Sequence, residues 1–299
     1  MTRPLPTPTL AALAACTLAV LASAAPAHAQ RNFDWSGELA SGSTLRVYTT
    51  NGTVTVREAS GRGARIHAET ENAEQGEIRF TTDRADGGIR VCALRENSSC
   101  NENGIQSRGS WDGRRSRGRA NFTVEVPRGV VVRVSSGNGD VAVSGATANV
   151  HASSGNGDVR VAAGAVNVNA STGNGEVMVD GARGPVHAST GNGRVTVSTA
   201  SGPVNASTGN GRVEVAIASR AAGDMEFSSG NGNITVTLPS DFSARIDATT
   251  GHGGFESDFP LRVNGRISSS RVSGTIGQGG GRMRLSTGNG TITLRRAGR

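Results

Sequence analysis

The tripeptide Gly-Asn-Gly is the feature that most constrains the fold of this chain. It begins at Gly137, Gly155, Gly173, Gly191 and Gly209, so successive copies are 18 residues apart. A fixed short period indicates that one structural unit is copied and stacked, each copy covering a face that it cannot bury alone. We therefore expect an array of equal coils, a coil being one copy of the repeat.

Polar and apolar residues alternate within one copy. Val150, Ala152 and Val159 are separated by polar residues such as His151 and Asp158. Because successive side chains of a strand point to opposite faces, the apolar set is expected to point inward and the polar set outward. The inward residues are small, which predicts two walls lying close together. Ser or Thr occupies further inward positions at 154, 172, 190 and 208.

Two all-β folds fit this pattern. In a single-chain β-solenoid, each coil of about 18 residues contributes two short strands, which pair with equivalent strands about 4.8 Å away. In an antiparallel β-meander or sandwich, Asn-Gly would instead form two-residue hairpin turns. We favour the solenoid because a constant coil length matters when identical positions stack, whereas a meander tolerates loops of varied length.

The tripeptide itself is predicted to turn the chain between the two walls. Glycine adopts positive φ without steric cost, and asparagine tolerates the left-handed region better than most residues. In a solenoid the asparagines would form an amide ladder along one edge, and such ladders stabilise stacked strands. The members of this turn ladder are Asn138, Asn156, Asn174, Asn192, Asn210, Asn231 and Asn289.

The chain divides into three segments. Residues 1–29 have the features of a signal peptide, residues 30–128 form irregular β coils, and residues 129–299 carry the regular repeats, continuous with the region before them. A copy near residue 45 already matches the repeat register, and a last copy, 283–294, closes the chain. Larger apolar residues near the C-terminus predict a cap over the core. They are Met225, Phe227, Phe242, Phe255 and Phe259.

Export is the expectation from the N-terminus. The apolar run 10–25 is followed by Ala-His-Ala, and no later apolar run is long enough to span a bilayer. Lipidation of Cys16 is a weaker alternative, because the apolar run continues past that cysteine. Cleavage would leave Cys92 and Cys100 as an even pair of cysteines in an oxidising compartment. We expect them to form a disulfide that holds the loop between them in place and acts only locally.

Charge favours an anionic partner. All 31 basic residues are arginines, and the formal net charge is +7, which favours attraction to anionic polysaccharides or lipid head groups. An arginine-rich run amid Gly and Ser reads as a loop and a candidate interaction surface. Export and the lack of interleaved aromatic residues disfavour nucleic acid. The run contains Arg108, Arg114, Arg115, Arg117 and Arg119.

These features resemble one bacterial family, the β-strand-repeat candidate adhesins, which are of unknown function and related to the head-GIN candidate auto-transporter adhesins. The resemblance rests on the signal peptide, the opening Asp34-Trp35-Ser36-Gly37, the cysteine excursion, and Ser-Thr-Gly-Asn-Gly followed by Val-x-Val. It extends over residues 33–294. The resemblance implies an exported β-solenoid-like domain associated with the cell envelope, and it brings no catalytic residue.

One outward column carries charges that could support chemistry. It contains Asp140, Asp158, Glu176, Arg194 and Arg212. Stacked carboxylates repel, which a cation or a Glu176–Arg194 pair would relieve. Calcium rolls need an aspartate in each turn, where this chain has asparagine. Two carboxylates about 5 to 9.5 Å apart would suit glycoside hydrolysis, but small side chains leave nothing to bind a sugar.

We therefore expect no metal, no cofactor and no enzymatic activity. The predicted function is that of an exported, non-catalytic, adhesin-like interaction or scaffold module of the bacterial cell envelope. The alternative is a carbohydrate-active β-helix enzyme that uses the carboxylate column. The partner would be an envelope protein or an anionic polysaccharide or lipid surface. The sequence leaves open the oligomeric state, the handedness of the solenoid and the side of the outer membrane.

Overall fold

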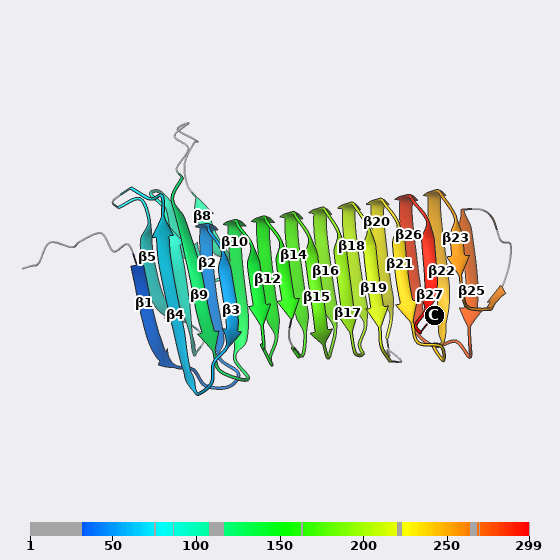
Figure 1. Cartoon of the computed structure of the whole chain (residues 1–299), viewed down its shortest axis with the longest axis horizontal. Helices are drawn as coiled ribbons and strands as arrows, with labels where there is room; N and C mark the ends of the chain where they lie inside the picture. Colours follow the sequence, from blue (N-terminus) through cyan, green and yellow to red (C-terminus); the bar gives the residue numbers. More distant parts are fainter. Residues whose placement is uncertain are drawn as a thin grey trace, which may run out of the picture. The chain divides into compact units, whose positions relative to one another are not determined.

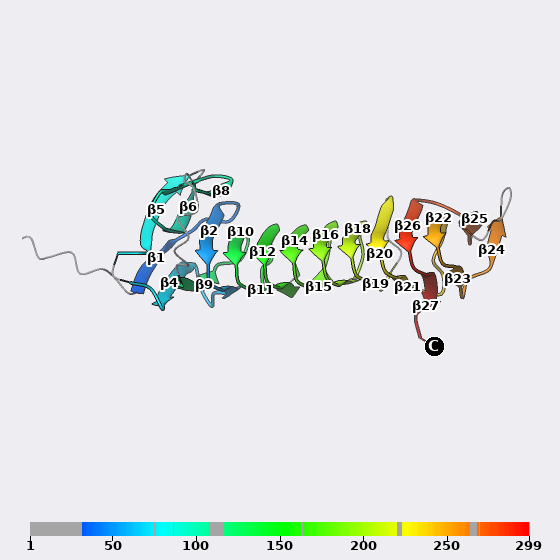
Figure 2. The same ribbon diagram turned by 90° about the horizontal axis from the view of Figure 1, so that it is seen from above.

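The strands on either side of each Gly-Asn-Gly corner lie in two different sheets (Figures 1 and 2). The structure, a computed structural model, describes residues 32–74, 76–85, 87–107, 117–162, 164–219, 223–263, 268 and 270–298. The expected signal peptide with Cys16 lies outside these residues, as do Arg108, Arg114 and Arg115. All regular elements in the described part of the chain are strands.

Equivalent strands of successive copies pair in parallel at a constant offset. Val150 lies opposite Val168, which lies opposite Val186, so each step along the sheet is one copy of the repeat. The turn region follows the same rule, since Gly157 N donates to Asn174 O at 2.9 Å. The predicted solenoid is confirmed. The antiparallel meander is wrong for these repeats, because strands joined by Asn-Gly belong to opposite sheets rather than to one hairpin.

The 12-stranded sheet and the 13-stranded sheet face each other across the core, and a separate hairpin is formed by β7 (Ser98–Asn101) and β8 (Gly104–Ser107), all counted within the described residues. In spatial order the 12-stranded sheet contains β1 (Asn32–Glu38), β4 (Gly63–Glu71), β9 (Arg119–Val126), β3 (Val54–Glu58), β11 (Val141–Ser144), β13 (Val159–Ala162), β15 (Val177–Ala182), β17 (Val195–Thr199), β19 (Val213–Ile217), β21 (Ile234–Leu238), β27 (Ile292–Arg296) and β23 (Phe255–Ser257). The 13-stranded sheet contains β24 (Leu261–Val263), β25 (Arg271–Ile276), β22 (Ala244–His252), β26 (Arg282–Asn289), β20 (Met225–Asn231), β18 (Val204–Asn210), β16 (Val186–Asn192), β14 (Val168–Asn174), β12 (Val150–Asn156), β10 (Val131–Asn138), β2 (Thr44–Asn51), β6 (Gly88–Leu94) and β5 (Arg79–Ala85).

The core is a thin layer of small side chains between the two sheets. Val150, Ala152 and Val159 are at most 2% exposed, as the alternation predicts. Full burial of one valine contributes about 1.5 to 3 kcal/mol before entropic costs. The inward hydroxyls are also buried, and each finds an acceptor in the neighbouring coil: Thr172 Oγ1 donates to Gly157 O at 2.7 Å, and Thr190 Oγ1 to Gly175 O at 2.9 Å. These bonds offset the cost of burying a polar group.

Stacking order departs from chain order at the C-terminal end. The last copy does not lie at the end of the stack: β26 pairs in parallel with β20 on one side and with β22 on the other. In the opposite sheet β27 lies between β21 and β23, which Figure 1 shows with the C-terminus inside the array. The outermost coil is therefore the one in which His252 replaces the asparagine. Behind it, β25 and β24 run antiparallel.

A similar rearrangement occurs at the N-terminal end. The coil of β2 and β3 stacks directly on that of β10 and β11, although more than 70 residues separate them in sequence. Antiparallel strands β1, β4 and β5 follow on the far side. Large apolar side chains gather at this end, where Phe33 stacks on Phe80 at 5.2 Å and Phe80 meets Phe122 edge-on at 5.9 Å.

The predicted large residues at the other end are also in the core. Met225, Phe227, Phe242 and Phe259 are buried, and Phe255 packs against them partly exposed.

Candidate interaction surface

A continuous column of exposed asparagine side chains runs along the Gly-Asn-Gly edge. Each side-chain Nδ2 donates to Oδ1 of the neighbouring asparagine, at 2.8 Å for Asn156 to Asn138 and at 2.6 Å for Asn289 to Asn231. Sequence reasoning missed Asn51, which accepts from Asn138 at 2.7 Å. Its signal was the Asn51-Gly52 pair in the copy near residue 45. The remaining donors are Asn174, Asn192, Asn210 and Asn231, each at 2.8 Å.

The two glycines of each corner are required for different reasons. A Cβ on Gly155 would lie 2.4 Å from the carbonyl oxygen of Gly137 in the next coil, so the backbones stack without room for a side chain. Gly157 has φ +141° and its Cβ would be 2.5 Å from Gly139 O. The expected left-handed asparagine is wrong, because Asn72 and Asn97 are the non-glycine residues with positive φ in the described chain. The corner asparagines serve the ladder instead.

The outward carboxylates beside the corner accept backbone hydrogen bonds. Asp140 Oδ1 accepts from the N–H of Asp158, and Asp158 Oδ1 accepts from that of Glu176, both at 2.8 Å. Asp158 also pairs with Arg160 at 2.7 Å. A Glu176–Arg194 pair, one of the two ways considered above to relieve repulsion in this column, is absent among the described residues. Within the same residues no three His, Cys, Asp or Glu side chains converge to hold a metal ion.

The outer face of the 13-stranded sheet carries two further columns in register. In one column the buried Tyr48 is followed by the half-buried serines Ser135, Ser153, Ser171, Ser189, Ser207 and Ser228 and then by the exposed Ser286 and Thr249. The other column carries larger side chains, most of them exposed. Its members are Arg46, Arg133, His151, Asn169, His187, Asn205, Glu226, Arg284 and Asp247. We call these the serine column and the mixed column. Neighbours within each are about 4.8 Å apart.

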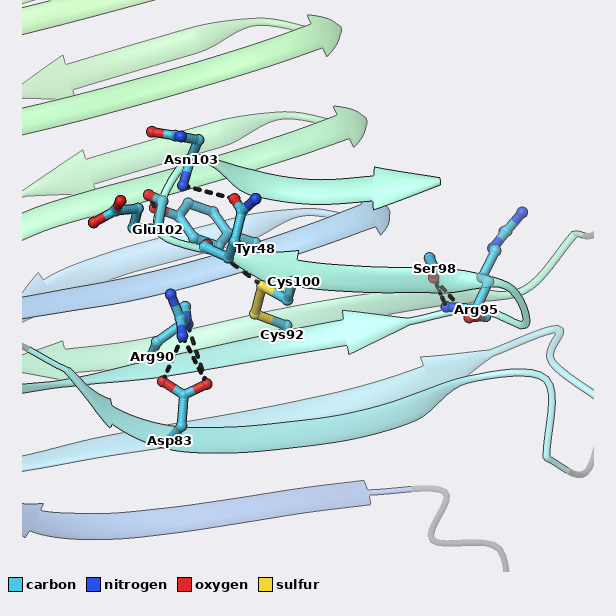
Figure 3. Close-up of a disulfide and its surroundings, with 10 residues drawn as sticks. Tyr48, Asp83, Arg90, Cys92, Arg95, Ser98, Cys100, Glu102 and Asn103 are labelled. Atoms are coloured by element: carbon cyan, nitrogen blue, oxygen red, sulfur yellow. Dashed lines mark hydrogen bonds and ion pairs between the residues drawn. A yellow bond between two sulfur atoms is a disulfide. The ribbon is translucent and has the colours of Figure 1, made fainter. Parts of the chain in front are cut away.

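A disulfide-linked hairpin covers one end of this outer face (Figure 3). Cys100 of β7 is bonded to Cys92 of β6 with an S–S distance of 1.99 Å. Tyr48 of β2 donates its hydroxyl to Glu102 O at 3.0 Å, and Leu94 and Ile105 complete a small apolar cluster under the hairpin. Burial raises the pKa of the Tyr48 hydroxyl. The excursion around the cysteines is thus a lid packed on β2, outside the main core.

Three arginines from adjacent strands align where the lid ends. Arg90, Arg46 and Arg133 are cross-strand neighbours on β6, β2 and β10. Arg90 is paired with Asp83 at 2.9 Å, and Arg46 is 6% exposed. Arg133 is exposed and makes no hydrogen bond or ion pair with any described residue. Sequence reasoning did not single it out, because one arginine on an outward position carries no signal by itself.

The described part of the predicted arginine-rich run belongs elsewhere. Arg119 lies in β9 of the 12-stranded sheet, opposite Glu71. Arg117 is exposed just before that strand. The structure thus brings neither residue onto the outer face of the 13-stranded sheet.

An ion cluster on the 12-stranded sheet ties β1 to β4. His67 Nδ1 lies 2.6 Å from Asp34 Oδ1, and His67 Nε2 lies 3.1 Å from Glu69 Oε1. Hydrogen bonds to Asp34 and then to Glu69 raise the pKa of His67. With one carboxylate on each ring nitrogen, the arrangement suits an imidazolium clamp rather than a metal ligand.

Most of the chain matches one known protein family. A family profile described as Toastrack DUF4097 matches residues 43–295. The chain belongs to the Toastrack family. This confirms the resemblance drawn from the sequence, and the Toastrack match covers both the regular coils and the coil of β2 and β3.

This Toastrack chain also matches solved structures at low sequence identity. They are a candidate cell adhesion protein from Clostridium sporogenes (11% identity, TM-score 0.27, 89% of this chain and 99% of that chain) and a candidate adhesin from Bacteroides fragilis (12%, 0.43, 89% and 97%). A third is a candidate adhesin from Parabacteroides merdae (9%, 0.36, 89% and 96%). No curated protein matches the sequence significantly. Among the described residues, no helix has the length and apolar character needed to cross a membrane.

Proposed function

We propose that this Toastrack chain is an exported, non-catalytic interaction module of the bacterial cell envelope, and that the outer face of its 13-stranded sheet is the binding surface. The observation that carries the proposal is the pair of in-register outward columns. The serine column repeats one short side chain from Ser135 to Ser286 at a constant spacing, and the mixed column beside it carries polar and charged side chains. A surface of this kind matches an extended or repetitive partner, because one contact can recur at each coil. Many weak contacts then add without a deep pocket.

Export is part of the proposal. A disulfide between Cys92 and Cys100 is typical of an oxidising compartment and rare in the cytosol. The signal-like residues 1–29 point the same way. The division into an irregular segment 30–128 and a regular segment 129–299 likewise stays part of the proposal.

The carboxylate column supports a structural role over a catalytic one. Asp140 and Asp158 each accept a backbone hydrogen bond that holds the next coil in register. A glycosidase needs one carboxyl group with a raised pKa in a site that excludes water. A groove of about 1050 Å³ lies away from this column, and none of the three carboxylates lines it. The groove is open to solvent, and the ion pair of Glu58 and Arg128 forms part of its lining. Glycan hydrolysis that disappears when Asp140, Asp158 and Glu176 are replaced together would overturn the non-catalytic assignment.

Blocking one face tests the binding surface. Asn169 and Asn205 are exposed in the mixed column, whereas Met178 and Thr196 occupy outward positions on the opposite sheet. We expect Asn169→Tyr with Asn205→Tyr to abolish recovery of envelope material in a pull-down, because neutral bulky rings obstruct the face. The control pair Met178→Tyr with Thr196→Tyr should retain it. Equal recovery by both double variants would reject this face as the binding surface.

A further inference from the structure

The outer face is not uniform along its length, and its electrostatic character changes at the lid. Beyond the lid the mixed column begins with Arg133 and His151 and continues with Asn169, His187 and Asn205. The positive charge is therefore concentrated where the exposed face starts. Figure 2 shows the hairpin strand β8 on the outer side of the 13-stranded sheet at this end.

Arg133 and His151 are adjacent and have unused donors. They are cross-strand neighbours on β10 and β12, and neither makes a hydrogen bond or ion pair with a described residue. Burial and then the Arg133 guanidinium lower the pKa of His151. The imidazole is held neutral beside an unpaired cation, so it can donate one N–H without adding a repelling charge.

The surrounding charges leave a net positive potential. Three guanidinium groups, on Arg90, Arg46 and Arg133, face two carboxylates, those of Asp83 and Glu102, around Tyr48. Asp83 is engaged by Arg90, which forms two hydrogen bonds to its Oδ2 at 3.1 and 3.0 Å. A guanidinium that remains unpaired in such a setting binds carboxylate, sulfate or phosphate oxygens in a fork geometry.

We infer that Arg133 and His151 form an anion-binding subsite at the lid end of the outer face, and that the ligand is an acidic polysaccharide. This rests on the proposed binding face. We choose a polysaccharide because of the surface next to the subsite. There the Ser, Asn and His side chains of the two columns offer hydrogen bonds, and they present no apolar group that would enter a lipid layer. Ser135 and Ser153 adjoin the two residues as further donors and acceptors. One acidic sugar unit sits on the guanidinium, and the following units lie along the serine column.

Binding assays with defined polymers test the inference. Polygalacturonate is the probe, uncharged dextran is the neutral control, and vesicles of anionic phospholipid test the other source of anions. Wild-type protein is expected to bind polygalacturonate and neither control, with affinity falling as salt increases. Arg133→Gln should weaken binding about tenfold, the loss expected for one charge-assisted hydrogen bond. His151→Gln should weaken it less.

Arg194→Gln is the matched control. Arg194 is exposed beside the corner and makes no ion pair with a described residue, so its replacement removes the same charge away from the face. It should leave polygalacturonate binding within about twofold of wild type. Equal losses for Arg133→Gln and Arg194→Gln would show diffuse charge attraction and overturn the subsite. Preference for vesicles over polygalacturonate would overturn the ligand class. If dextran binds as well as polygalacturonate and tolerates Arg133→Gln, the subsite fails while the proposed face survives.

Discussion

Contacts with the neighbouring coil determine which residue types can occupy the repeated positions of this protein. Gly155 faces the carbonyl oxygen of Gly137, Thr172 donates to Gly157 O, and Asn174 donates to Asn156. Each of these contacts crosses between neighbouring coils rather than along the chain. The repeated tripeptide is therefore best understood as an interface that every coil forms with two neighbours.

Replacing one stacked glycine tests this explanation. Gly155→Ala places a methyl group 2.4 Å from Gly137 O, so the coils must separate locally. We expect a loss of about 1 to 3 kcal/mol in unfolding free energy, as for other overpacked sites. Urea denaturation followed by circular dichroism measures it. Gly63→Ala is the control, because a Cβ there meets nothing within 4 Å, and it should change stability by less than about 0.5 kcal/mol. Equal stability of the two variants would contradict the explanation.

The strands at the two ends of the array differ from the repeated strands because they form the edges of the sheets. A parallel sheet of identical coils ends in an unpaired edge, which other chains can extend. Here antiparallel strands β1 and β4 end the 12-stranded sheet on one side, and β25 and β24 end the 13-stranded sheet on the other, where the 12-stranded sheet finishes in the short parallel strand β23. At the N-terminal end the His67 cluster adds a charged link between β1 and β4.

The link between β1 and β4 is expected to depend on pH. Since the folded-state pKa of His67 is raised, the cluster stabilises the fold fully below the unfolded pKa of about 6.5, and this contribution is lost as pH rises through the folded pKa. The side chain is 41% exposed, so the effect is small, up to about 1 kcal/mol. Thermal unfolding of wild type and His67→Gln should differ most near about pH 5.5 and converge near about pH 9. A difference that stays constant over this range would rule out the charged link.

At the scale of the whole chain, the coil of β26 and β27 is inserted between two earlier coils instead of being stacked on the end of the array. Deleting residues 283–299 would remove β27 and nearly all of β26, and with them the pairing partner of β20 and of β22. We expect the segment 244–276 to lose its protection in hydrogen exchange, while the coils from β10 to β19 keep theirs, because repeat arrays are stabilised by nearest neighbours. The control is Leu261→Ala, at the partly exposed outer edge, which should leave 244–276 protected. Full protection of 244–276 in the truncated chain would show that the cap holds without the inserted coil.

The sequence predicted what is local and repeated. The inward positions of Val150 and Ala152, the burial of Thr172, and the coil length all follow from period and alternation. The position of β26 does not, because every coil presents the same stacking edges and the period says nothing about which edges meet. The lid over Tyr48 depends on contacts across more than 40 residues, and the exposure of Arg133 depends on where that lid ends. The roles of the asparagine ladder and of the arginine-rich run stay predictions.

The position of β26 between β20 and β22 also ties the pairing of β22 to a strand that follows it in the sequence. A chain emerging from its N-terminus can stack the coils from β10 to β21 as they appear, but β22 has no adjacent partner strand on that side until β26 arrives. A chain that ends before residue 282 therefore leaves the facing edges of β20 and β22 unpaired.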